Sequence, residues 1–328
     1  MRAVISAVDF AVPARRMSND EFSAFVETSD EWIRSHTGIG NRHVAEPSVA
    51  TSDLALEACR KVLARAGVAA EQVDLVLVAT ATGDFIGFPS VACIVQDGLG
   101  AKNAAAMDLV AGCTGFIYAL ETARNFVMGG GARNVLVAGA DILTRVMNWK
   151  DRNTCVLFGD GAGAVLVQAD AADGDRGIFM SMLRSDGSGA RLLERTEGGT
   201  RFPFTDGVVD PARTFLKMDG RQVYNFATRV VSEGIAEMME KNKLNADDVA
   251  WIVPHQANVR IIEAAAKRIK LPMSKFFVNI EEYANTSAAS IPIALSEMTA
   301  KNLLKKGDLI LTFGFGAGLT YGGNLIRW

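Results

Sequence analysis

Apolar and polar residues follow one another along the chain in blocks that predict alternating strands and helices. In the first half we predict strands over residues 3–12, 74–80, 104–110, 134–140 and 158–168. The runs at 74–80 and 134–140 are apolar throughout, as is typical of strands buried on both faces. Helical spacing and capping residues predict helices over 18–26, 30–37, 51–66, 90–98 and 116–127. We expect Thr51 or Ser52 to cap the third of these.

The second half repeats this order. A helix over 223–242 and a strand over 249–253 resemble the helix and strand within 54–81, and a strand over 276–280, a helix over 285–304 and a strand over 308–313 resemble the unit around Cys113. We therefore predict an α/β fold of two similar βαβ-rich halves, residues 1–172 and 173–328, with helices layered around parallel-rich sheets. Cys113 and Asn285 then fall at equivalent helix starts, which would face each other across a pseudo-twofold axis.

Composition narrows the function classes. The 328 residues are 49% hydrophobic and carry a net charge of -3, so no global charge favours nucleic acid or an anionic membrane. The start of the chain lacks a signal-peptide pattern, and the longest apolar candidate for a membrane span is interrupted by Asp108. The four cysteines form no CxxC pair, which argues against zinc and disulfides and favours a reduced, cytoplasmic setting.

Cys113 is the first candidate for chemistry. Small residues lead a predicted strand up to it, and a predicted helix begins directly after it. The positive end of a helix dipole lowers a thiol pKa from about 8.5 toward roughly 3.5–7.5 and makes a nucleophile. The alternative is a small buried cysteine that packs as a hydrophobe. This stretch alone does not decide between them.

Three further segments offer partners. His255 follows Pro254 at the exit of a predicted strand, where α/β sheets present ligands, although a lone histidine is more often structural. Asn285 opens a helix and would be an N-cap in the simplest interpretation. The glycine-rich segment 313–320 forms either a tight hairpin or a backbone cradle for an oxyanion. The glycines at 159–163 are not a nucleotide loop, because a strand follows them rather than a helix.

Together these segments resemble the β-ketoacyl-acyl-carrier-protein synthase III family, a branch of the thiolase-fold condensing enzymes. The matching motifs run through the whole chain: Ser-Asp-Glu-Trp-Ile at 29–33, Phe-Pro-Ser at 88–90, Ala-Gly-Cys-Thr-Gly-Phe at 111–116, Phe-Gly-Asp-Gly-Ala-Gly at 158–163, Pro-His-Gln-Ala-Asn at 254–258, Asn-Thr-Ser-Ala-Ala-Ser at 285–290 and Gly-Phe-Gly-Ala-Gly at 314–318. The resemblance implies a thiolase-like fold with αβαβα layers and a homodimer.

The resemblance also implies the reaction. Cys113 takes an acyl group from acyl-CoA, with the backbone N–H groups of Cys113 and Ala317 as the oxyanion hole. His255 and Asn285 then donate hydrogen bonds to the thioester carbonyl of malonyl-acyl-carrier protein, which loses carbon dioxide and attacks the acyl-cysteine. The product is a 3-oxoacyl-carrier protein that starts fatty acid synthesis. No metal or other cofactor takes part; coenzyme A enters as the substrate's thioester.

Other family roles carry over position by position. The resemblance implies CoA binding by Trp32, Arg152 and Asn258, an acyl pocket of Leu143, Phe158 and the Phe88 lent by the partner subunit, and carrier-protein docking by Arg260, Lys267 and Arg268. These three charges would otherwise be read as an ordinary solvated helix face. The chain departs from the family at His36, commonly Arg, for which Arg34 is the candidate substitute. It also departs at Ala284, usually Gly, and at Asn225, often basic.

Related enzymes are the alternatives. A thiolase proper needs a second cysteine in the C-terminal glycine-rich loop, and no cysteine follows Cys155. A hydroxymethylglutaryl-CoA-type synthase needs a glutamate that no motif supplies. A condensing enzyme that makes a quinolone, polyketide or dicarboxylic precursor keeps the same three residues and is the runner-up. A non-catalytic acyl-CoA or carrier-protein binding module should have lost one of Cys113, His255 and Asn285.

Overall fold

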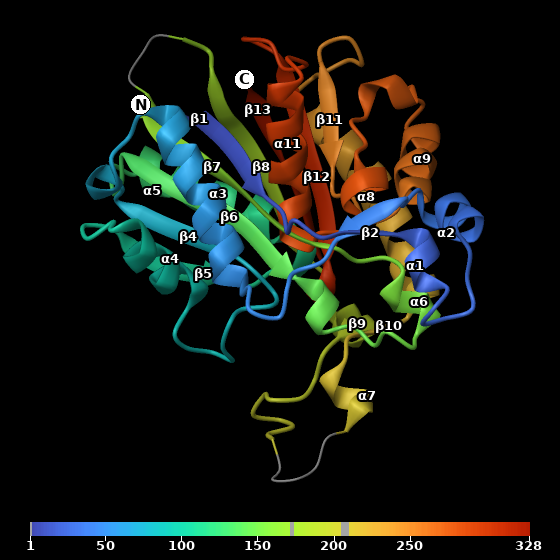
Figure 1. The fold of residues 1–328 in the computed structure, drawn as a ribbon. Coiled ribbons are helices and arrows are strands. Elements are labelled where there is room, and N and C mark those ends of the chain that lie inside the picture. The colour runs from blue at the N-terminus through green and yellow to red at the C-terminus, as the bar shows by residue number, and fades with distance from the viewer. Residues whose placement is uncertain (1, 171–173, 205–209) are drawn as a thin grey trace.

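Two mixed sheets form the frame of the protein. The structure, a computed structural model, describes residues 2–170, 174–204 and 210–328 (Figure 1). The first sheet has the order β1-β7-β6-β4-β5 and contains β1 (Arg2–Ala11), β4 (Leu75–Ala79), β5 (Ala105–Leu109), β6 (Asn134–Ile142) and β7 (Asp160–Asp170). The second has the order β11-β12-β13-β8 and contains β8 (Gly177–Ser185), β11 (Trp251–Pro254), β12 (Leu309–Gly316) and β13 (Thr320–Arg327).

The two sheets repeat one pairing pattern. In the first, β1–β7 and β7–β6 are antiparallel, and β6–β4 and β4–β5 are parallel. In the second, β8–β13 and β13–β12 are antiparallel and β12–β11 is parallel. This agreement confirms the internal repeat. The expected change of halves at 172/173 lies outside the described residues.

The strand expected over 276–280 is reduced to a single bridge. Phe276 bridges Ile252 in parallel, and the Phe277 N–H donates to the Ile252 carbonyl at 2.9 Å. Beyond that, β11 has ended at Pro254, and the side chain of Gln256 takes the place of a strand partner. It donates to the Phe277 carbonyl at 3.1 Å and accepts from the Asn279 N–H at 3.1 Å. The prediction of a regular strand here was wrong because a side chain satisfies the backbone instead.

Helices complete five layers. The outer face of the first sheet carries α3 (Thr51–Ala66) and α4 (Val91–Leu99), and the outer face of the second carries α8 (Gly220–Lys241) and α9 (Val259–Arg268). Between the sheets lie α5 (Gly115–Met128) and α11 (Ser290–Ala300), which contact strands of both (Figure 1). The layers therefore run α, β, α, β, α, which confirms the predicted fold class.

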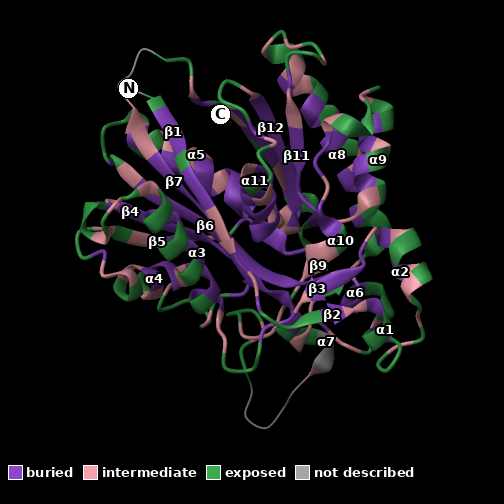
Figure 2. Ribbon diagram, turned by 45° about the horizontal axis from the view of Figure 1, so that its top comes forward, coloured by how far each residue is buried: buried purple, intermediate pink, exposed green. Residues whose placement is uncertain are grey.

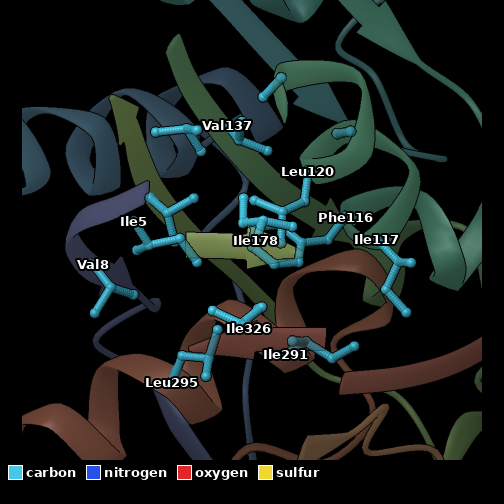
Figure 3. Close-up of a cluster of buried hydrophobic side chains, with 14 of the residues drawn as sticks. Ile5, Val8, Phe116, Ile117, Leu120, Val137, Ile178, Ile291, Leu295 and Ile326 are labelled. Carbon is cyan, nitrogen blue, oxygen red and sulfur yellow. The ribbon is translucent and has the colours of Figure 1, made fainter. Parts of the chain in front are cut away.

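The central layer holds a continuous apolar core. Figure 3 shows side chains of α5, such as Phe116 and Leu120, facing Ile291 and Leu295 of α11, with strand residues such as Ile326 between them. All five are buried, and Figure 2 shows the same concentration of buried residues along the strands. Burial of each such side chain contributes about 1.5–3 kcal/mol. This packing fixes the starts of α5 and α11 relative to each other.

Several predicted helix ends need correction. The first helix, α1 (Asn19–Phe22), stops before 26, and α11 stops at Ala300 rather than 304. The N-cap of α3 is Ala50, whose N–H donates to Asp53 at 2.7 Å. The expected cap Thr51 instead donates its hydroxyl to the Thr82 carbonyl at 2.6 Å. The predicted helix before Gly38 is confirmed as α2 (Asp30–Thr37).

Short elements surround the site. They are β2 (Arg16–Ser18) paired with β3 (Asn41–His43), β9 (Leu193–Glu194) paired with β10 (Lys217–Met218), α6 (Arg152–Cys155), α7 (Pro211–Thr214), α10 (Ile280–Tyr283) and the single turns η1 (Ala70–Gln72), η2 (Gly112–Thr114), η3 (Leu143–Arg145), η4 (Gly187–Leu192), η5 (Met273–Lys275), η6 (Ser287–Ala289) and η7 (Ala317–Leu319). Among the helices of the described ranges, none is long and apolar enough to cross a membrane.

Candidate active site

Cys113 lies in η2, the tight turn that connects β5 to α5. The predicted strand–cysteine–helix order is therefore confirmed, with one 3₁₀ turn between the cysteine and the helix. Gly112 has a φ of 53°, in the left-handed region that favours glycine.

The glycine-rich segment 313–320 packs directly on this turn. A β-carbon at Gly316 would lie 2.5 Å from the Cys113 backbone nitrogen, and one at Gly112 would lie 2.7 Å from the Ala317 nitrogen. Only glycine permits so close an approach. The segment is not one flexible loop, since β12 continues to Gly316 and only Ala317–Leu319 form the turn. The contact brings the N–H groups of Cys113 and Ala317 to one place, as an oxyanion hole requires.

His255 follows β11 and is buried. Its N–H donates to the Phe313 carbonyl at 2.7 Å, and its ring lies edge-on to Phe315 with centroids 5.5 Å apart. The ring Nδ1 lies 2.7 Å from the hydroxyl oxygen of Ser290, the first residue of α11. Burial lowers the pKa of His255 to about 3, because the interior disfavours the charged imidazolium. The imidazole is therefore neutral at physiological pH.

Asn285 is held by its neighbours on both sides. Its N–H donates to the Leu157 carbonyl at 3.0 Å, and its carbonyl accepts from the Gly159 N–H at 3.0 Å. Its side-chain Oδ1 accepts from the Ser287 N–H at 2.9 Å, which leaves the amide NH₂ as the free donor end. The N-cap interpretation was wrong for α11, whose N-cap is Ala289. Ala284 before it has a φ of 56°, a strained value where glycine would be at ease.

The three residues meet at one cavity. Cys113, His255 and Asn285 all line it, together with Asn258 and Phe158. Cys113 and Phe158 also line a second cavity, which continues past Leu143 and Ala317 and includes Glu194 and Arg195. Cys113 thus stands where two cavities meet, a position suited to passing an acyl chain from one to the other.

The thiol is less acidic than its place before a helix predicts. Burial raises the pKa of Cys113 to about 12, and a hydrogen bond with Ser287 only partly opposes this. Cys113 is half-buried, and its exposed part faces the cavities rather than bulk solvent. The expected lowering of the pKa was wrong, because dense protein from both halves surrounds the sulfur. In the free site the thiol is protonated and needs a proton acceptor.

The polar residues that hold this site were missed in the sequence. Ser287 and Ser290 stand within the Asn-Thr-Ser-Ala-Ala-Ser motif, and each contacts one of the three central residues. Asp141 ends β6 and is completely buried beside them. A lone acid at the end of an apolar strand was the available signal. The described residues contain no group of three or more His, Cys, Asp or Glu placed to hold a metal ion.

The candidate CoA residues gather at α2. The Arg152 guanidinium lies 4.6 Å from the centre of the Trp32 ring, and the His36 ring stacks on Trp32 with centroids 4.4 Å apart. The Asn258 amide donates to the His36 carbonyl at 3.1 Å. Arg34, the candidate substitute at this departure, is held in ion pairs with Asp30 at 2.9 Å and Glu281 at 2.7 Å.

The remaining candidates lie on the surface. Phe88 is 88% exposed and lines neither cavity of Cys113 in its own chain. Arg260, Lys267 and Arg268 are exposed on α9, where Arg268 also pairs with Glu233 at 3.4 Å.

The layered fold and a cysteine, histidine and asparagine at one cavity between its halves define a condensing enzyme of the thiolase-like class. Family models described as 3-oxoacyl-[acyl-carrier-protein] synthase III match residues 107–187, and as its C-terminal part residues 239–328. The β-ketoacyl-[acyl-carrier-protein] synthase III of Caldanaerobacter subterraneus subsp. tengcongensis is 49% identical over 97% of this chain and 95% of its own. That of Roseiflexus castenholzii is 47% identical over 99% and 98%. The chain belongs to the β-ketoacyl-[acyl-carrier-protein] synthase III family.

Solved structures agree. The 3-oxoacyl-[acyl-carrier-protein] synthase III of Aquifex aeolicus superposes with a TM-score of 0.90 at 40% identity, covering 99% of this chain and 100% of that one. A priming β-ketosynthase of the R1128 polyketide pathway is 35% identical with the same TM-score, over 99% and 96%. The chain is therefore an acyltransferase of the condensing type that performs the initiating condensation of fatty acid synthesis.

Proposed function

We propose that Cys113 carries the acyl group and that His255 and Asn285 bind the thioester carbonyl of malonyl-acyl-carrier protein. The observation that supports these roles is the convergence of all three side chains on one cavity, which a second cavity continues from the sulfur. Residues far apart in the sequence meet here because the starts of α5 and α11 face each other across the central layer.

In the first half-reaction the sulfur of Cys113 attacks the carbonyl of an acyl-CoA. Charge develops on the carbonyl oxygen, where the N–H groups of Cys113 and Ala317 stabilise it. The coenzyme A thiolate leaves, and the acyl chain occupies the cavity lined by Leu143 and Phe158.

In the second half-reaction the malonyl thioester loses carbon dioxide. The carbonyl oxygen then becomes an enolate, and His255 and Asn285 donate hydrogen bonds to it. A neutral imidazole suits this task, since Nε2–H donates while Nδ1 accepts from the Ser290 hydroxyl. Asn285 donates without titrating, because its Oδ1 is occupied by the Ser287 N–H. Each fixed donor of this kind is worth about 3–4 kcal/mol. The carbanion attacks the acyl-cysteine and releases a 3-oxoacyl-carrier protein.

The outer residues would recruit the substrates. We place the CoA adenine at Trp32 and Arg152, with Asn258 on the pantetheine arm, and the acidic carrier protein on Arg260, Lys267 and Arg268. An exposed aromatic such as Phe88 is suited to a homodimer contact that completes the partner's acyl pocket. The enzyme would act in the cytoplasm and need no metal or other cofactor.

Intact-mass measurement tests the nucleophile. Wild-type protein incubated with a panel of acyl-CoAs should gain one acyl group, and Cys113→Ala should gain none. Equal gain in both would overturn the assignment. The variants His255→Ala and Asn285→Ala should still become acylated but release carbon dioxide from malonyl-carrier protein at least 100-fold more slowly. Loss of acylation in both would contradict the division of roles.

A further inference from the structure

Ser287 connects the nucleophile to a buried acid. Its hydroxyl hydrogen-bonds to the Cys113 thiol and to the Asp141 carboxylate. The residue is 1% exposed and has a φ of 52°, a backbone conformation that side-chain-bearing residues rarely adopt. Strain of this kind persists where the surroundings impose it, often at functional sites. Here the Ser287 N–H bond to Asn285, at 2.9 Å, holds the turn.

Asp141 directs one oxygen to the fold and the other to the site. Its Oδ1 accepts from the Thr80 hydroxyl at 3.1 Å, the Ala81 N–H at 2.8 Å and the Thr82 hydroxyl at 2.7 Å. Its Oδ2 lies 3.4 Å from the Ala288 nitrogen, a long contact next to Ser287. The carboxylate is completely buried, and burial raises its pKa. A purely structural brace between β6 and η6 would explain the Oδ1 bonds but not the link to the sulfur.

Counting protons shows what this chain of groups permits. With a neutral thiol and an ionised Asp141, S–H donates to Ser287 and the Ser287 O–H donates to the carboxylate. With a thiolate and an ionised Asp141, the single hydroxyl proton faces two anions, and one stays unpaired in a buried site. With a thiolate and a protonated Asp141, both hydrogen bonds simply reverse direction. The net charge stays at minus one, so this is the thiolate state that the site accommodates.

We propose that Asp141 and Ser287 form a proton relay for Cys113. The thiol proton passes to the Ser287 oxygen as the Ser287 hydroxyl proton passes to Asp141 Oδ2, and the thiolate attacks the acyl-CoA carbonyl. When the tetrahedral intermediate collapses, the carbon–sulfur bond to coenzyme A breaks. The proton returns from Asp141 through Ser287 to the departing sulfur, which leaves as the coenzyme A thiol. Ser287 and Asp141 are positioning and proton-transfer residues that act through Cys113, so the proposal rests on the proposed nucleophile.

Other titratable groups surround the sulfur and compete for this role. His255 follows β11 and Tyr224 lies on α8, both on the first cavity, while Glu194 of β9 and the adjacent Arg195 line the second. Among them only a neutral imidazole is a ready proton acceptor near neutral pH. The test must therefore separate a proton taken by Asp141 from one taken by His255.

The pH dependence of alkylation provides this test. We would measure the rate at which iodoacetamide modifies the Cys113 peptide by mass spectrometry between pH 6 and pH 8, together with the acylation rate. A pair that shares one proton has a constant thiolate fraction between its two macroscopic pKa values, so wild type should give a flat profile. A lone thiol of high pKa gains about tenfold in rate per pH unit instead.

Variants locate the acceptor. Ser287→Gly removes the hydroxyl, keeps the backbone N–H and suits the positive φ; it should lose the flat profile and fall at least tenfold in rate at pH 6. Asp141→Asn should do the same. Thr80→Val, which removes a hydroxyl from the far oxygen of the same carboxylate, should keep the flat profile even if its melting temperature falls. His255→Ala should also keep it.

Two results would overturn the relay. One is a wild-type profile that rises tenfold per pH unit. The other is a flat profile that survives in a folded Ser287→Gly, as judged by its circular dichroism, but disappears in His255→Ala. In either case acylation of Cys113 in the intact-mass experiment would still support the proposed nucleophile, so the two failures are distinguishable.

Discussion

The buried, neutral His255 should make the folded protein sensitive to mild acid. Its pKa is lowered to about 3 in the folded state by burial, from an ordinary value of 6.5. The unfolded chain therefore binds a proton below pH 6.5 that the folded protein refuses until about pH 3. Since stability falls wherever the unfolded state binds more protons, His255 costs stability as the pH drops through this window, and the cost saturates below it.

The size of the effect follows from the shift. Each pKa unit is worth 1.36 kcal/mol, so the full shift corresponds to about 5 kcal/mol. At pH 5 the folded imidazole is still neutral, and the loss relative to pH 7 is about 2 kcal/mol from this residue alone. That is a large fraction of the stability of a typical domain.

Urea unfolding of wild type and His255→Gln isolates this contribution. Both proteins would be measured at pH 7 and pH 5 at one protein concentration, followed by tryptophan fluorescence. Carboxylates elsewhere affect both proteins alike and cancel in the comparison. The free energy of unfolding of wild type should fall by about 2 kcal/mol more than that of the variant. Equal losses would show that His255 titrates normally and that the buried neutral imidazole is wrong.

Three further predictions concern the surroundings of the site. Gly316→Ala should abolish acylation, because its β-carbon would lie 2.5 Å from the Cys113 nitrogen, whereas Gly187→Ala, with open space around it, should acylate normally in the same mass assay. Arg260→Glu should raise KM for malonyl-acyl-carrier protein about tenfold and weaken its salt dependence while KM for acyl-CoA stays unchanged; a change in both would refute carrier-protein docking there. Trp32→Ala should raise KM for acyl-CoA by about 5- to 30-fold, and an unchanged value would remove it from the CoA site.

Much of the fold follows from local pattern. The apolar runs at 74–80 and 134–140 could only be strands buried on both faces, and Gly38, Gly67 and Gly129 ended their helices as expected. The repeat of these units predicted five layers and a meeting of Cys113 with Asn285. These features rest on periodicity and backbone preference, which act over a few residues and are visible in the sequence.

Other features depended on partners distant in the chain. The strand expected at 276–280 gave way because Gln256 reaches over and satisfies its backbone groups. Thr51 left its expected capping role for a carbonyl at Thr82, 31 residues away. Neither side chain carries a local signal of its choice, because a hydrogen-bond partner is set by what the folded chain brings near.

The chemistry of the site shows the same division. The residue types Cys113, His255 and Asn285, each at the start of a helix or the exit of a strand, were determined by the sequence alone. Their acidities were not: the pKa of Cys113 is raised and that of His255 lowered because both halves close around them and exclude water. Desolvation depends on all the atoms that surround a group, and only the tertiary structure supplies them.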